Sequence, residues 1–334
     1  FAFSLSGLFS AQYLLGALGA GADCRGPRPF GRVDRGFHSH GPVALEPWFG
    51  RISGRGWLVE ITPKMFRMTF HTAKKYSRLW LRLASMSFFE IWATRMNSLG
   101  WLFGKLVRLG FFFIFITAIF RHTKTIKGYT LPEAMLFFLT FNLVDVIAQL
   151  FLRGIYGIRR IVAEGELDYY LIQPVSALFR VACQTVDILD FLVAIPVVIL
   201  TFWAIGQLPV VSLTAGRLFL YIFLIFNGVA IAFSIHVVVA SIAVATQQME
   251  NAIWLYRDLM ILGRFPVDIY APGMRLILTF VIPIAVMTSF PAKAVLGLLA
   301  GGWVVFAGAL AIFSVAASLA LWHWCLRRYT SVSS

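Results

Sequence analysis

Long apolar segments recur along the sequence, and this recurrence decides the fold class. After residue 98, stretches of about 20 mostly apolar residues return again and again, and about 20 such residues let an α-helix cross about 30 Å of hydrocarbon. Hydrophobic residues make up 59% of the chain and charged residues only 13%, whereas about a quarter of a soluble domain is charged. The sequence therefore predicts an all-α, polytopic membrane protein.

Six segments are predicted to cross the membrane. The third contains Pro196, which predicts a kink, and the fourth is longer than one crossing requires. A polar stretch, 246–275, is expected to form a loop before the fifth, and residues 290–300, too few to cross, predict a short re-entrant segment before the last. The six predicted spans are 98–120, 131–152, 182–205, 217–245, 276–288 and 303–326.

The first 63 residues differ from the rest. Residues 1–22 carry no charge but lack the basic start of a signal peptide, residues 23–56 are rich in Gly, Pro and Arg and should stay irregular, and the first methionine is Met65. We expect residues 1–63 to be an irregular or non-native extension and residues 64–334 to form the six-span domain.

Residues 64–95 combine basic and apolar side chains at helical spacing. This pattern is typical of an amphipathic helix that lies in the membrane interface and contacts lipid. The basic members are Lys64, Arg67, Lys74, Lys75, Arg78, Arg82 and Arg95, and the apolar ones include Met65, Phe66, Phe70, Trp80 and Phe88.

The distribution of positive charge predicts the orientation. The net charge of +14 would point to nucleic acid in a soluble protein, but in a membrane protein it reflects which loops face the cytoplasm, so we expect no nucleic-acid partner. From Lys64 onward most Lys and Arg fall on the side of the N-terminus. The exceptions are Arg121, Lys124, Lys127, Arg217 and Lys293. Both termini are therefore expected in the cytoplasm, in a plasma membrane of the bacterial type.

Several separated motifs occur in a characteristic order. The predicted cytoplasmic loop contains GELDYYLIQP at 165–174; further on come FPVDIY at 265–270, FPAK at 290–293 and RYTSVSS at 328–334. Together they resemble the membrane subunits of type-2 ABC exporters, in the six-span branch of the ABC-2 permeases. The resemblance covers about 64–334.

The resemblance implies a half-transporter. Two such permeases, identical or merely similar, would form the translocation pathway and couple to a separate cytoplasmic ATPase. ATP would be bound by that partner, because the chain has no G-x-x-x-x-G-K-[ST] loop: its nearest approach, 100–106, has the wrong spacing. The chain itself is expected to be no enzyme and to carry no cofactor.

The loop after the second span is the predicted ATPase-coupling loop. Its carboxylates would pair with basic residues of the ATPase, and Leu167 and Leu171, four apart on one helical face, would form an apolar anchor. An ordinary solvated turn is the alternative. The residues assigned to the loop are Glu164, Gly165, Glu166, Leu167, Asp168, Leu171 and Pro174.

The second predicted span carries a polar stripe, Asn142, Asp145 and Gln149. An acidic residue at membrane depth is costly and usually faces a bundle interior or an aqueous path. The stripe therefore either lines the pathway or holds the bundle together.

Other polar residues receive structural interpretations. Asp187 and Asp190 are expected to cap the third span, and His236 to hydrogen-bond within the bundle. No pair of cysteines has the spacing of a metal site, and no second ligand lies at suitable spacing from His236, so no metal is expected.

Two further functions stay open. An accessory or structural subunit would have the same sequence pattern, whereas an intramembrane enzyme should show catalytic motifs such as H-E-x-x-H or G-x-S-x-G, which the sequence lacks.

Overall fold

The structure is a computed structural model that describes residues 70–208, 214–246 and 252–330. The chain divides into two units, 1–64 and 65–334, and all described residues belong to the second. The predicted extension 1–63 lies outside the described residues and stays a prediction. The described residues form helices and no β-strand, with one isolated bridge between Ile126 and Tyr129.

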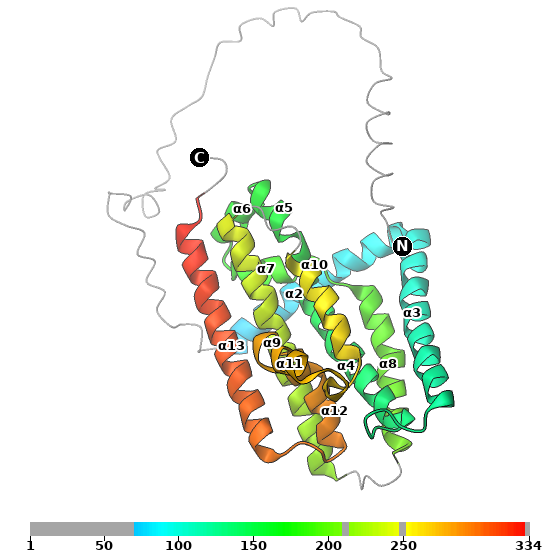
Figure 1. The fold of residues 1–334 in the computed structure, drawn as a ribbon. Helices are drawn as coiled ribbons and strands as arrows, with labels where there is room; N and C mark the ends of the chain where they lie inside the picture. Colours follow the sequence, from blue (N-terminus) through cyan, green and yellow to red (C-terminus); the bar gives the residue numbers. More distant parts are fainter. Residues whose placement is uncertain (1–69, 209–213, 247–251, 331–334) are drawn as a thin grey trace, which may run out of the picture. The chain divides into compact units, whose positions relative to one another are not determined.

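Five long apolar helical segments dominate the bundle (Figure 1). All coincide with predicted spans, which confirms an all-α polytopic membrane protein. A bent pair of short helical segments, described below, raises the number of candidate spans to six when it is counted as one. The five segments are α3 (Arg95–His122), α4 (Leu131–Leu152) with its continuation to Ala163, α8 (Ile188–Gly206), α9 (Ala215–Thr246) and α13 (Gly301–Arg328).

Helix α4 is the centre of the bundle. Its start is fixed by Glu133, whose carboxylate accepts hydrogen bonds from the backbone N–H (2.6 Å) and the hydroxyl (2.8 Å) of Thr130, the geometry of a capping box. It packs along α8 and α9, and a buried hydrogen bond of 3.1 Å joins the hydroxyls of Thr140 and Tyr221 of α9. By contrast, α3 is mostly exposed and presents an apolar surface to lipid or to a partner.

The third predicted span begins later than expected. Residues 177–182 form a separate short helix, α7 (Ala177–Ala182), and α8 begins only at Ile188. The carboxylate of Asp187 accepts a hydrogen bond of 3.1 Å from the backbone N–H of Asp190, so Asp187 caps the helix as predicted.

The fifth predicted span, 276–288, is wrong as a continuous helix. The chain forms α11 (Pro272–Leu276) and the π-helix η5 (Ile277–Val281), breaks at Pro283, and continues as the π-helix η6 (Ala285–Ser289) and α12 (Phe290–Val295). The two halves are bent by 86°. Pro283 has no N–H for a helical bond and disfavours helical geometry in the residue before it, which explains the break.

The bent pair is a re-entrant hairpin, because both of its ends meet one residue. Asp268 forms ion pairs with Lys293 of α12 (2.7 Å) and with Arg275 of α11 (4.0 Å). The hairpin therefore starts earlier than the predicted re-entrant segment 290–300. Tyr129, in the loop before α4, donates a hydrogen bond of 2.7 Å to the same carboxylate, which places both ends of the hairpin beside the α3–α4 loop.

A broken segment before the hairpin runs the length of α4. It comprises α10 (Ala252–Met260), η3 (Ile261–Arg264) and η4 (Val267–Ile269). Arg257 lies 3.4 Å from the hydroxyl of Tyr156, beyond one end of α4, and Asp268 contacts Tyr129, beyond the other. The prediction that 246–275 is a loop on one side is thus wrong: 252–269 passes from one end of the bundle to the other.

Gly228 lets the hairpin approach α9. A Cβ atom at this position would lie 2.6 Å from the backbone oxygen of Met287 in η6. We expect Gly228→Ala to destabilise the fold by roughly 1–3 kcal/mol, because backbone on both sides must shift. Gly216→Ala, in the same helix with nothing near its Cβ, is the control. Thermal unfolding in detergent compares them, and equal melting temperatures would contradict the hairpin packing.

The Asp268 cluster predicts a pH dependence. Burial alone raises the pKa of Asp268, but hydrogen bonds from Lys293 and Tyr129 outweigh it and hold this pKa below its ordinary value. A depressed pKa stabilises the fold above the unfolded value of about 3.9, and the contribution is lost as pH falls through the folded pKa. Asp268→Asn should therefore melt below the native chain at pH 7, with a gap that closes below about pH 4. Lys124→Met, in the exposed α3–α4 loop, is the control and should melt as the native chain does at both pH values.

Candidate functional site

The predicted coupling loop forms the tip of the bundle beyond α4. The 3-10 helix η2 (Arg153–Gly157) and α5 (Ile158–Ala163) lead outward, and α6 (Glu166–Ile172) returns; α5 and α6 project past the neighbouring helices in Figure 1. Gly165 joins the two helices at φ 73°, a left-handed conformation that glycine adopts without strain. Glu164 and Pro174 are exposed, whereas Glu166 and Asp168 are half-buried.

The predicted apolar anchor differs in the structure. Leu167 is 0% exposed and packs in the core, so it cannot serve as an anchor for a partner. Tyr169, Leu171 and Ile172 are exposed by 62%, 43% and 79%. The tip therefore offers an apolar surface made by these three residues, next to the exposed Glu164.

Two other parts of the chain brace the tip. Helix α2 (Phe70–Ala93) contacts the segment that follows α6: Lys75 donates a hydrogen bond to the backbone oxygen of Pro174, and the hydroxyl of Tyr76 accepts one of 3.0 Å from Ser176. At the other chain end, burial and then the carboxylate of Asp168 raise the pKa of Tyr329, so the GELD and RYTS motifs meet. Residues 331–334 lie outside the described part.

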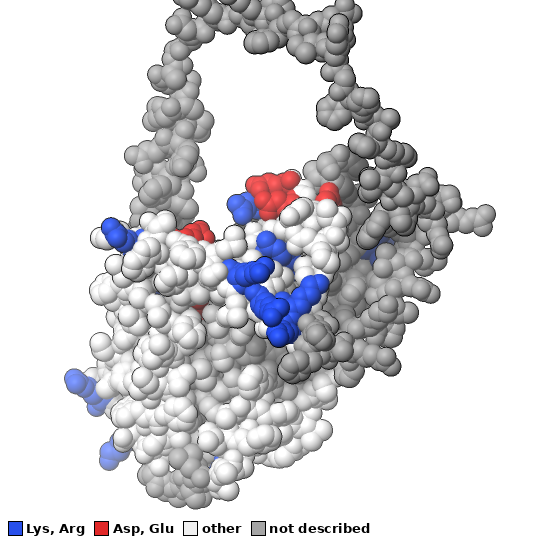
Figure 2. All heavy atoms as spheres, turned by 180° about the vertical axis from the view of Figure 1, so that it is seen from behind, with Lys and Arg blue, Asp and Glu red and all other residues white. Residues whose placement is uncertain are grey.

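Helix α2 presents an exposed basic surface formed by its Lys74, Lys75, Arg78 and Arg82. Figure 2, seen from behind, shows Lys and Arg gathered on this face and acidic side chains above them. Further along, α2 exposes Phe89 and Trp92. Basic residues beside exposed aromatic ones are typical of helices at a membrane interface.

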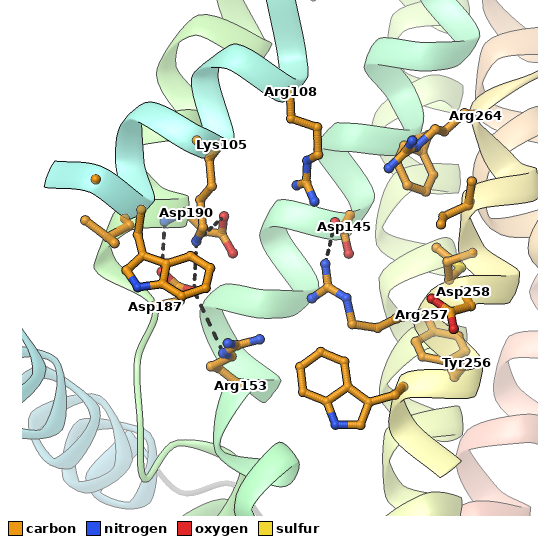
Figure 3. A pocket seen from close by; sticks show the side chains of 18 residues that line it. Lys105, Arg108, Asp145, Arg153, Asp187, Asp190, Tyr256, Arg257, Asp258 and Arg264 are labelled. Atoms are coloured by element: carbon orange, nitrogen blue, oxygen red, sulfur yellow. Dashed lines mark hydrogen bonds and ion pairs between the residues drawn. The ribbon is translucent and has the colours of Figure 1, made fainter. Parts of the chain in front are cut away.

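A charged cavity of about 890 Å³ lies between α3, α4, the start of α8 and the α10–η3 segment. Figure 3 shows its side chains converging from these four elements. Its apolar wall includes Trp101, Phe141, Leu189, Trp254 and Ile261. A cavity with both apolar and charged walls is suited to an amphipathic molecule.

Ion pairs organise the charged wall. Lys105 of α3 lies 2.9 Å from Asp187 and 2.9 Å from Asp190. Arg153 lies 3.9 Å from Asp187, and Arg257 lies 3.8 Å from Asp145. Each of these three carboxylates thus has a cation from another helix, so the pairs join α3 and η2 to the start of α8, and α10 to α4.

The predicted polar stripe is divided among three environments. Asp145 lines the cavity. Asn142 donates to the backbone oxygen of Phe138 in its own helix (2.8 Å), and Gln149 is buried and donates to the hydroxyl of Tyr156 (2.9 Å). Asp145 thus borders a cavity and pairs with Arg257, whereas Gln149 joins α4 to η2 within the bundle. That the stripe lines a translocation pathway stays a prediction.

Sequence reasoning missed most of the charged wall. The signal was present in α3, where Lys105 and Arg108 stand inside an apolar span, but such residues also snorkel to headgroups. Arg257 and Arg264 were hidden because their segment was interpreted as a loop.

His236 is fully buried and its Nδ1 lies 2.7 Å from the backbone oxygen of Ala232, which confirms the predicted hydrogen bond within the bundle. In the described part of the chain, no group of three or more His, Cys, Asp and Glu side chains is arranged to hold a metal ion.

A family profile described as ABC-2 family transporter protein matches residues 106–333. The chain belongs to the ABC-2 transporter family. The match covers α4 to α13, and with them the tip, most of the cavity and the hairpin. This ABC-2 protein is an integral membrane protein and a membrane subunit of an ABC transport system. Members of its family work with an ABC ATPase. No curated protein and no solved structure matches it.

Lys105 is the central cation of the charged wall of this ABC-2 protein. Lys105→Met would leave Asp190 unpaired and Asp187 with only its longer contact to Arg153, which should destabilise the fold by roughly 3 kcal/mol. Adding Asp190→Asn should restore part of the loss, because it removes one of the two charges. Lys124→Met, in the exposed α3–α4 loop, is the control. Thermal unfolding in detergent measures all four chains, and equal effects of Lys105→Met and Lys124→Met would refute the role of Lys105.

Proposed function

We propose that the chain is the transmembrane subunit of an ATP-driven export system and that it forms the translocation pathway as a dimer with an identical or similar permease. Membership of the ABC-2 transporter family supports this proposal. The mostly exposed α3 supplies an apolar surface that a second permease can cover. ATP is bound and hydrolysed by a separate cytoplasmic ATPase, and this chain performs no chemistry itself.

The ATPase docks on the tip formed by α5 and α6. The observation that carries this assignment is the exposure of Tyr169, Leu171 and Ile172 beside Glu164 at the end of the bundle. Apolar side chains exposed to water favour a protein partner, and a carboxylate next to them favours a basic one. Tyr76 and Lys75 of α2 hydrogen-bond to the segment that follows α6. A movement of the tip on ATP binding would therefore be transmitted to α2.

The tip belongs to the cytoplasmic side. The positive-inside rule supports this orientation, with both termini and α2 in the cytoplasm of a cell whose plasma membrane holds the protein. Three residues of the predicted cytoplasmic loop 246–275 leave the cytoplasmic set: Arg257 and Arg264 line the cavity inside the bundle, and Arg275 pairs with Asp268 beside the α3–α4 loop. The remaining Lys and Arg still favour the same orientation.

Co-purification tests the docking site. The tagged chain is expressed with an ABC ATPase from its own genome and extracted in mild detergent. Glu164→Arg combined with Ile172→Arg reverses a charge and removes an exposed apolar side chain, so we expect recovery of the ATPase to fall about tenfold or more. Lys124→Glu, a charge change in the α3–α4 loop, should leave recovery unchanged.

The outcomes separate the two parts of the proposal. Retention of the ATPase by the double variant would show that the docking site is elsewhere. Failure of any ABC ATPase to associate with the native chain would overturn the proposed function itself.

A further inference from the structure

Two arginines of the charged cavity have no anionic partner among the residues that the structure describes. Arg108 of α3 and Arg264 of η3 both line it, and neither forms an ion pair with a carboxylate in the described part of the chain. Asp258 also lines the cavity, but Figure 3 shows it beside Tyr256, apart from both arginines.

The two guanidinium groups converge on one region of the wall. Arg264 lies over the rings of Phe112 (5.2 Å) and Phe141 (5.5 Å). Arg108 stands one helical turn before Phe112 on α3, so Arg108 and Phe112 face the same side of that helix. Figure 3 shows Arg108 pointing into the cavity. Their positions therefore suit simultaneous contact with one ligand.

Arg264 is held in place but is incompletely satisfied. Its Nε is buried and finds no hydrogen-bond partner within the described part of the chain, while the rings of Phe112 and Phe141 fix the guanidinium. A cation within an apolar bundle is costly unless an anion or polar groups surround it. Two neighbouring cations raise this cost, and an anion between them would lower it.

We propose that Arg108 and Arg264 bind the anionic headgroup, a phosphate or a carboxylate, of an amphipathic ligand whose apolar part packs against Trp101 and Phe141. Guanidinium groups bind both anions through paired N–H donors. The volume of about 890 Å³ accommodates a headgroup with part of a chain. As a statement about cargo, the assignment rests on the proposed export function, but the binding step requires this chain alone.

Direct binding to the purified full chain tests the proposal without an ATPase. Radiolabelled dodecyl phosphate is titrated onto the chain in a neutral maltoside detergent, and dodecylphosphocholine and inorganic phosphate are added as competitors. We expect saturable binding of dodecyl phosphate. Dodecylphosphocholine, which has no net charge, and inorganic phosphate, which has no chain, should compete at least about tenfold less well.

Substitutions locate the site. Arg108→Gln and Arg264→Gln should each weaken binding about tenfold or more, because each removes charge-assisted hydrogen bonds, and Arg264→Lys should retain part of the affinity. Arg121→Gln, at the other end of α3, is the matched control and should bind as the native chain does. Thermal unfolding of each variant identifies any that has lost its fold.

Three results would overturn the proposal. They are native affinity in folded Arg108→Gln and Arg264→Gln chains, equal binding of the zwitterionic amphiphile, and equally strong competition by inorganic phosphate. The last would assign the site to a free anion. Co-purification of the ATPase, measured on the same variants, reports on the proposed function separately: the ATPase can associate while dodecyl phosphate fails to bind, and the reverse.

Discussion

Most charged side chains inside this apolar bundle pair with an opposite charge on another helix, and the need for partners determines how the chain is threaded. Water is absent from the hydrocarbon region, so an unpaired charge there costs several kcal/mol. Lys105 meets this requirement with Asp187 and Asp190, and Arg257 with Asp145. Each pair joins helices that are distant in sequence. The ion pairs therefore fix which helices are neighbours, and apolar side chains pack between them.

The broken segment 252–269 shows the consequence for the backbone. It carries Arg257, Asp258 and Arg264, a composition that no lipid-exposed helix tolerates, and it runs instead against α4. Irregular backbone at this depth also needs hydrogen bonds from the protein. The structure supplies them: the N–H of Val267 donates to Ser289 at 3.2 Å, and Tyr270 donates to the backbone oxygen of Leu262 at 2.8 Å. Side chains of the hairpin and of the residue that follows the broken segment thus satisfy the backbone of that segment.

Hydropathy was sufficient to predict α3, α4, α8, α9 and α13, because the energetic cost of placing a residue in lipid depends on that residue and its near neighbours. It failed at the fifth crossing for the same reason. A window over 276–288 contains only apolar and small residues, while a window over 252–268 is penalised for charges whose partners, Asp145 and Tyr129, lie more than a hundred residues away. Leu167 was misjudged similarly: the helical spacing of Leu167 and Leu171 is correct, but only contacts from distant helices reveal which of the two is buried.

The tip and the cavity are connected by short, well-packed segments. Arg153 begins η2, which leads directly into α5, and it also contacts Asp187 at 3.9 Å. Ser87 of α2 accepts a hydrogen bond of 3.1 Å from Val186, the residue before Asp187. A displacement of α5, α6 or α2 would therefore move Asp187 relative to Lys105. Lys105 joins α3 to α8 through two ion pairs of 2.9 Å. If Lys105 separated from Asp187 and Asp190, α3, the least buried of the long helices, would be free to move away from α4. That movement would widen the cavity beside Arg108.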